Sequence, residues 1–196
     1  MKKHIVCIGD SNTHGYCADP NDCADGGIRF NEDERWTCLL QKALGDDYLV
    51  TEEGLSGRTT VFPDPLYENM DVFSYFWALL KSHEYIDLLI IMLGTNDSKE
   101  RFHASAACIG WGMERLCRKA MVTDCWAPGA KPNILIVSPP PVDPRVETSR
   151  VPTKWARAAW RNPASWPPTT GKRPNCWASI SWTPRAVNST SWTSCT

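Results

Sequence analysis

The sequence predicts an α/β fold built on a parallel sheet, and three observations support this prediction. Short apolar runs alternate along the chain with longer segments in which apolar residues recur at helical spacing. The run at 86–93 is apolar almost throughout, as expected of a central strand that is buried on both faces. Several runs end in small polar residues, which is typical of loops at the carboxyl edge of such a sheet.

In the first part of the chain, a strand is predicted at 4–8 and a second strand at 48–51. The segment between them begins with a polar loop at 14–33, which is rich in Gly, Asp and Asn and long enough to shape a substrate pocket. A helix is predicted at 34–44, where Trp and Leu residues are spaced to share one face, and Gly45 is its expected C-cap.

The next segments continue the alternation. Helices are predicted at 70–80 and 104–121, and strands at 86–93 and 133–137. Because the strands are expected to be parallel, the polar loops that follow the first three of them meet at one edge of the sheet.

Composition limits the function classes. The 196 residues suit one domain, and the apolar run at the start is too short for a secretory signal or a membrane span, so we expect a cytoplasmic protein that does not bind membranes. Nine cysteines without a Cys-x-x-Cys pair indicate neither a disulfide framework nor a zinc site, and we expect no metal and no cofactor.

The three polar loops carry groups suited to acyl transfer from an ester, which needs a nucleophile, oxyanion donors and a base. Ser11 is the candidate nucleophile, although Gly9-Asp10-Ser11 is also ordinary turn composition. The candidate oxyanion donors are the N–H groups of Ser11 and Gly57 and the side-chain amide of Asn96.

The segments 9–13 (GDSNT), 56–60 (SGRTT) and 94–97 (GTND) resemble, in order, the first three motif blocks of the SGNH (GDSL-type) hydrolases. The longer runs 52–60 and 90–97 resemble the arylesterase/acyltransferase branch of that family. The resemblance extends from residue 3 to about 145.

This resemblance implies a flavodoxin-like three-layer fold and a serine esterase or acyltransferase that acts on small carboxylic esters through an acyl-enzyme. It implies Ser11 as nucleophile and an oxyanion hole formed by Ser11, Gly57 and Asn96, with Asp10 as a supporting hydrogen-bond acceptor outside the triad. Arg58 and Asp97 either order the loops or form a solvated ion pair.

The base of the family pattern, a histidine in a C-terminal Asp-x-x-His, has no counterpart here. His4, in a strand, and His83, at a helix end, are interpreted as structural. His14 is close to Ser11 in sequence and could approach the pocket as a base, and His103 carries no assignment. We therefore expect this polypeptide to have almost no esterase activity.

The tail differs from the rest in composition, so we divide the chain into an incomplete hydrolase domain at 1–147 and a tail at 148–196. The tail has seven basic residues, no acid, no leucine and six of the ten tryptophans, whereas residues 1–147 carry 14 Lys and Arg against 22 Asp and Glu. We expect it not to supply the last strand and helix, and the apolar surface left exposed would favour a homo-oligomer.

A change of reading frame between about Val146 and Lys154 would explain this composition. A shift of the frame by one base splits each TGG codon of Trp between two new codons. The first new codon ends in TG and encodes Leu, Met or Val, and the second begins with G. Read in this way, 192–196 can encode Asp-x-x-His. The rival interpretations are a basic interaction arm or a disordered extension.

Two other function classes stay open at this stage. The domain could be a non-catalytic flavodoxin-like module that holds a small ligand or an anion at 9–13, although Asp10 opposes an anion. A nucleic-acid role for the basic tail is the weaker idea, and we expect no nucleic-acid partner.

Overall fold

The sheet has five parallel strands. The computed structural model describes residues 1–143 and the backbone of 177–181. The strands are β1 (Lys3–Gly9), β2 (Tyr48–Gly54), β3 (Leu88–Met92), β4 (Ile134–Ser138) and β5 (Trp177–Ser181). Their order, β2-β1-β3-β4-β5, is that of flavodoxin-like doubly wound sheets.

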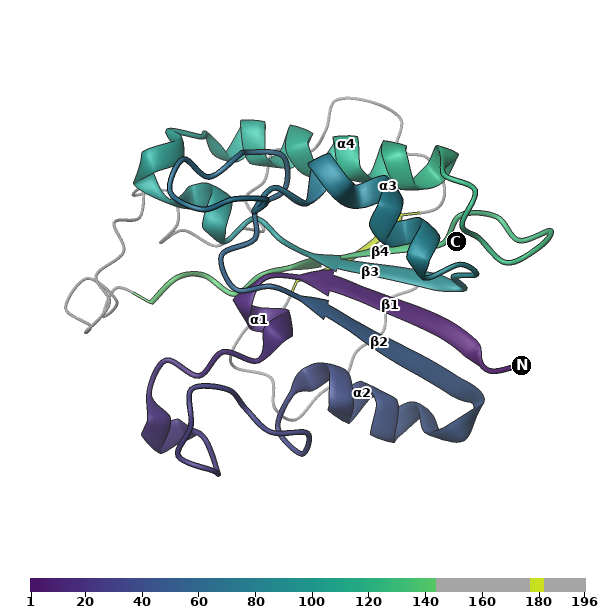
Figure 1. Cartoon of the computed structure of the whole chain (residues 1–196), viewed down its shortest axis with the longest axis horizontal. Coiled ribbons are helices and arrows are strands. Elements are labelled where there is room, and N and C mark those ends of the chain that lie inside the picture. Colours follow the sequence, from purple (N-terminus) through teal and green to yellow (C-terminus); the bar gives the residue numbers. More distant parts are fainter. Residues whose placement is uncertain (144–176, 182–196) are drawn as a thin grey trace.

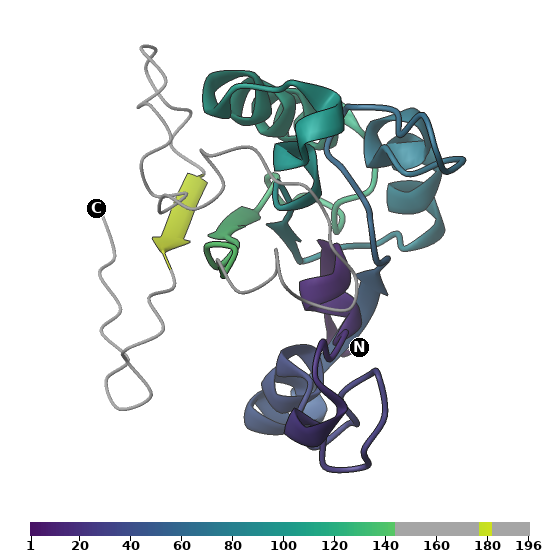
Figure 2. The same ribbon diagram turned by 90° about the vertical axis from the view of Figure 1, so that its left-hand side faces the viewer.

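Helices cover both faces of the sheet, so the fold has three layers (Figure 1). The α-helices are α1 (Ser11–His14), α2 (Trp36–Leu44), α3 (Val72–Ser82) and α4 (Ala106–Val122). Single 3₁₀ turns lie at Pro20–Asp22, Gly45–Asp47, Asn96–Ser98 and Glu100–Phe102. Figure 2 shows α2 on one side of the sheet and α3 with α4 on the other. The predicted α/β class and three-layer architecture are confirmed.

The alternation of side chains along β1 produces two cores. Val6 and Ile8 belong to the larger core, which β1 and β3 form with α3 and α4. Ile5 and Cys7 point to the other face, where α2 packs with Trp36. A strand that is buried on both faces explains why the first apolar run has no polar alternation.

The elements predicted for the described residues are present, with shifts of a few residues at their ends. The largest shift is in β2, which was expected to end at Thr51 and continues to Gly54. Glu52, Glu53 and Gly54 also pair with β1, although their composition is polar. Backbone pairing does not depend on side-chain polarity, so the strand is longer than its apolar run. The predicted C-cap Gly45 is confirmed, with φ 72°.

The tail departs from expectation in one respect. It was expected to supply no strand, but the backbone of β5 pairs in parallel with β4 from Ile134 to Ser138. Parallel pairing needs only backbone N–H and C=O groups, so the absence of an apolar period in the tail does not prevent it. The predicted loss of the last helix, the domain boundary at 147 and the frame change fall on residues outside those described.

Candidate active site

The loops that follow β1, β2 and β3 lie together at the carboxyl edge of the sheet. β1 has β2 on one side and β3 on the other, so the loop after β1 stands where the strand order reverses. Open α/β sheets bind ligands at this position. Ser11 starts α1 directly after β1, and its side chain is partly exposed.

Asp10 holds the loop after β1 in place through hydrogen bonds of its buried carboxyl group. It is fully buried and forms the N-cap of α1, and its Oδ1 accepts hydrogen bonds from the backbone N–H and the side-chain amide of Asn12, both at 2.9 Å. Burial raises the pKa of Asp10 to about 6, and the bonds from Asn12 oppose that rise. Asp10 is therefore a hydrogen-bond acceptor within the loop.

The second loop brings Gly57 to the same edge. Gly57 has φ 93°, a conformation that favours glycine, and Arg58 follows it with only 4% exposure. Leu55 at the start of the loop donates its N–H to the carbonyl of Gly9 at 3.1 Å. At Gly54 a Cβ would lie 2.3 Å from the backbone nitrogen of His14, so only glycine permits this close approach of α1 to β2.

Asn96 connects the three loops. Its side chain is buried, and Nδ2 donates to the carbonyl of Arg58 at 3.0 Å and to Oδ2 of Asp10 at 3.4 Å. Arg58 and Asp10 are the chain neighbours of Gly57 and Ser11. The structure therefore brings together the segments of all three residues that the sequence singled out as oxyanion donors.

Arg58 and Asp97 are both buried, which excludes the interpretation as a solvated ion pair. Oδ1 of Asp97 accepts the backbone N–H of Thr60 at 2.9 Å and also its hydroxyl, while the Arg58 guanidinium binds elsewhere. Burial raises the pKa of Asp97 to about 6, and the hydrogen bonds from Thr60 oppose that rise. Both residues order loops, which was the other interpretation.

Three residues that contribute to this site were not predicted from the sequence. Thr60 holds Asp97, Thr95 accepts from the Asn12 amide at 3.4 Å, and Tyr75 accepts from the Arg58 guanidinium at 2.9 Å. Thr60 and Thr95 lie inside the recognised motif blocks, which is a usable signal. Tyr75 reads only as part of an amphipathic helix, so nothing in the sequence indicates its role.

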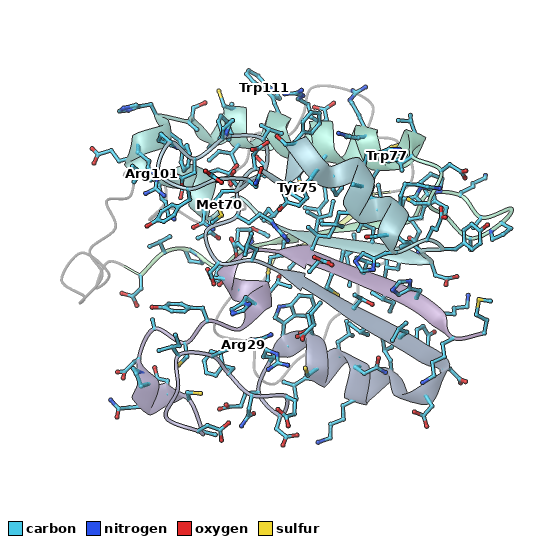
Figure 3. The ribbon with its side chains drawn as sticks, in the orientation of Figure 1. Arg29, Met70, Tyr75, Trp77, Arg101 and Trp111 are labelled. Atoms are coloured by element: carbon cyan, nitrogen blue, oxygen red, sulfur yellow. The ribbon has the colours of Figure 1, made fainter. Side chains whose placement is uncertain are left out.

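Two of the four histidines have partners away from Ser11. His4 contacts the Thr51 hydroxyl at 2.8 Å, and His83 contacts Glu53 at 2.7 Å at the end of α3. Both positions agree with the structural interpretation. His14 is the last residue of α1, and its carbonyl accepts from Arg29. Figure 3 places Arg29 on the α2 side of the sheet.

The described residues contain neither a metal-binding cluster nor a helix suited to cross a membrane. In residues 1–143 and 177–181 there is no group of three or more His, Cys, Asp and Glu side chains arranged to hold a metal ion. In the same residues no helix combines the length and the hydropathy that crossing a membrane requires.

Comparison with known proteins gives a family and several similar structures. Residues 7–165 match the model of the GDSL-like lipase/acylhydrolase family. The native structure of an aryl esterase from M. smegmatis is 39% identical, with TM-score 0.64 over 72% of this chain and 66% of that chain. A carbohydrate acetylesterase family member from Sinorhizobium meliloti is also 39% identical, with TM-score 0.64 over 72% of this chain and 64% of that one. The chain thus spans just under two thirds of these proteins. A search of the curated proteins returns no match.

Proposed function

Because the chain belongs to the GDSL-like lipase/acylhydrolase family, we propose that its three-loop site carries out acyl transfer from small carboxylic esters. The observation that supports the proposal is the pair of hydrogen bonds from Asn96 to Asp10 and Arg58, which joins Asn96 to the chain neighbours of Ser11 and Gly57. The similarity to an aryl esterase and to a carbohydrate acetylesterase family member supports an ester as the substrate.

Ser11 is the proposed nucleophile. Its Oγ forms a bond to the ester carbonyl carbon, its proton passes to a water molecule in this chain, which lacks the family's histidine, and the carbonyl oxygen takes the negative charge of a tetrahedral intermediate. When that intermediate collapses, the bond to the alcohol oxygen breaks, this oxygen takes up the proton from water, and the alcohol leaves behind an acyl-enzyme. Water then attacks the acyl-enzyme and releases the carboxylic acid. An alcohol that attacks the acyl-enzyme in place of water would give acyl transfer.

Three donors are proposed for the oxyanion. Ser11 is the first residue of α1, so its backbone N–H has no acceptor within the helix. Gly57 offers its backbone N–H. Asn96 has two amide hydrogens, of which one is held by the Arg58 carbonyl at 3.0 Å. The other makes the longer, 3.4 Å contact with Asp10, and we assign this hydrogen to the oxyanion.

The missing base limits the rate. The pattern of the family places it in the C-terminal Asp-x-x-His that this sequence lacks, and His4 and His83 are bound elsewhere. Loss of one triad member lowers turnover by roughly 10⁴- to 10⁶-fold in serine hydrolases and leaves the contribution of the oxyanion hole. We propose that this chain keeps that residual level.

An anion-binding module is the less favoured alternative. The loop that would hold the anion contains the Asp10 carboxyl, which already caps α1. An anion there would meet a group that is itself negative above its pKa of about 6.

The test is covalent labelling with an aryl fluorophosphonate, followed by intact-mass and peptide analysis. We expect slow addition of one phosphonyl group at Ser11, no addition in Ser11→Ala, and unchanged labelling in Ser82→Ala, whose hydroxyl binds Leu79 at the end of α3. The labelling decides the test, because the residual hydrolysis that an oxyanion hole supports does not require the Ser11 hydroxyl. Labelling of another residue, or equal labelling of wild type and Ser11→Ala, would contradict the proposal.

A further inference from the structure

Arg58 contacts its own loop, the loop of Asn96 and the last residue of β1, and it is almost fully buried, at 4% exposure. Its backbone N–H donates to the carbonyl of Leu55 at 3.0 Å, which closes the turn that contains Gly57. Its backbone carbonyl accepts from Asn96 at 3.0 Å. The main chain of Arg58 therefore sets where Gly57 and the Asn96 amide stand relative to each other.

The guanidinium reaches the ends of two strands. Nη1 donates to the carbonyl of Gly9, the last residue of β1, at 3.2 Å and also to the carbonyl of Glu53 near the end of β2. Nε donates to the hydroxyl of Tyr75 on α3 at 2.9 Å. Figure 3 shows Tyr75 between the α3 layer and the sheet. One side chain thus links β1, β2 and α3 directly beneath the loops.

Within residues 1–143, the hydrogen-bond partners of this buried cation are two carbonyls and a hydroxyl. Burying a charge is expensive unless hydrogen bonds replace its hydration, so the guanidinium stays in place only while these acceptors hold their positions. Its rigid, planar set of donors fixes their spacing in a way that the single ammonium of lysine does not. The arrangement therefore favours one geometry of the three loops over others.

We propose that Arg58 is a positioning residue that sets the spacing of the Ser11, Gly57 and Asn96 donors. The inference rests on the proposed function, because it gives those donors an oxyanion to bind. Arg58 acts through Gly9, Glu53 and Asn96 rather than on the substrate. Its loss should consequently slow the chemical step and leave ligand binding unchanged.

The test compares wild type, Arg58→Lys and Tyr75→Phe in phosphonate labelling of Ser11 across phosphonate concentrations. We expect Arg58→Lys to lower the maximal labelling rate by about 10- to 100-fold, since small displacements of reacting groups have effects of this size. The concentration giving half the maximal rate should change less than about threefold, as binding is unaffected. Tyr75→Phe keeps the ring and removes one acceptor, so a smaller fall is expected. Arg118→Lys, on exposed α4 surface, is the matched control and should match wild type.

Amide hydrogen exchange gives a readout that is independent of labelling. Peptides that cover 55–60 and 94–98 should exchange faster in Arg58→Lys, and a peptide over 20–27 should not change. Wild-type labelling rates with unchanged exchange in Arg58→Lys would overturn the inference while leaving the proposed function standing. If Arg58→Lys does not fold, a wild-type labelling rate in Tyr75→Phe overturns it. Absence of Ser11 labelling in wild type would instead remove the proposed function, and this inference with it.

Discussion

The loops at the carboxyl edge of the sheet and the loop at 15–35 are both polar, but they differ in burial. Asp10, Thr60, Arg58 and Asn96 are between 0% and 4% exposed. In the 15–35 loop most polar side chains face solvent, and bonds such as that from Asn21 to Asp19 lie at the surface. Loops of similar polar composition therefore differ in whether their polar side chains are buried or exposed to solvent.

The difference shows how this fold keeps a polar site rigid. A buried polar group destabilises the protein by about 1 to 3 kcal/mol if its partner is lost, whereas an exposed one turns to water. Each buried partner in the edge loops consequently constrains the others. The loop at 15–35 has no such constraint on most of its side chains, and the predictions below test this contrast from the largest expected effect to the smallest.

The largest effect is expected at Asn96. Asn96→Leu keeps the approximate volume and removes the amide, so Ser11 phosphonylation should slow by roughly 10²- to 10³-fold, as for other oxyanion donors. The carbonyl of Arg58 also loses its donor, which should lower the free energy of unfolding by about 2 kcal/mol. Labelling kinetics and urea unfolding measure the two effects. A labelling rate within threefold of wild type would remove Asn96 from the proposed oxyanion hole.

The second prediction concerns pH. Asp10 and Asp97 have pKa values of about 6 in the folded protein, against roughly 3.9 in an unfolded chain. Between these values the folded state binds more protons, so the free energy of unfolding falls as pH rises from about 4 to 6, by about 3 kcal/mol per carboxyl as an order of magnitude. Urea unfolding at pH 4.5 and 7 measures this fall.

Asp10→Asn isolates the contribution of this carboxyl. Glu52 and Asp64 have lowered pKa values, so their contributions to the free energy of unfolding rise with pH instead of falling. Both residues are present in wild type and in Asp10→Asn, so their contributions cancel when the two proteins are compared. Hydrogen bonds from Thr37 and Arg101, respectively, lower those two pKa values, against the rise that burial causes. We expect a smaller fall with pH in the variant. An equal fall in the two proteins would show that Asp10 does not titrate in this range.

A third prediction tests the buried bond between Thr60 and Asp97. Thr60→Val keeps the shape of the side chain but removes the hydroxyl that Asp97 accepts from. Because a hydrogen bond to a charged group is stronger than a neutral one, the free energy of unfolding at pH 7 should fall by about 2 kcal/mol. Urea unfolding checks this value. A change below about 0.5 kcal/mol would mean that the edge loops tolerate loss of a partner as surface loops do.

The smallest effect is expected in the 15–35 loop. Asn21→Ala removes a side-chain bond to Asp19 that is exposed to solvent. The free energy of unfolding should change by less than about 0.5 kcal/mol, as is usual for surface sites, and labelling of Ser11 should match wild type. A loss as large as that of Thr60→Val would erase the contrast between the two regions.

Sequence reasoning was most successful where a strong local pattern determines the structure. The apolar runs predicted β1 and β3, and the motif blocks located Ser11, Gly57 and Asn96 after the correct strands. The end of β2 was missed because Glu52 reads as a loop residue. In the fold its carboxylate binds Arg35 at 3.1 Å, a contact that depends on how α2 packs on the sheet.

The partners of buried polar groups were the least predictable feature. Arg58 and Asp97 lie in adjacent motif blocks, and their opposite charges suggested a pair. In the structure, Asp97 instead accepts a hydrogen bond from Thr60, and the Arg58 guanidinium donates to the Gly9 carbonyl and the Tyr75 hydroxyl. Such choices depend on which carbonyls and hydroxyls the fold leaves near a buried charge, and residue type alone does not encode them.

The most direct test of the account is a crystal structure of the Ser11 phosphonate adduct, which mimics the tetrahedral intermediate. We expect one phosphonyl oxygen to lie about 2.7 to 3.1 Å from the backbone nitrogens of Ser11 and Gly57 and from Nδ2 of Asn96. An adduct whose oxygens point away from Gly57 and Asn96 into solvent would contradict the account.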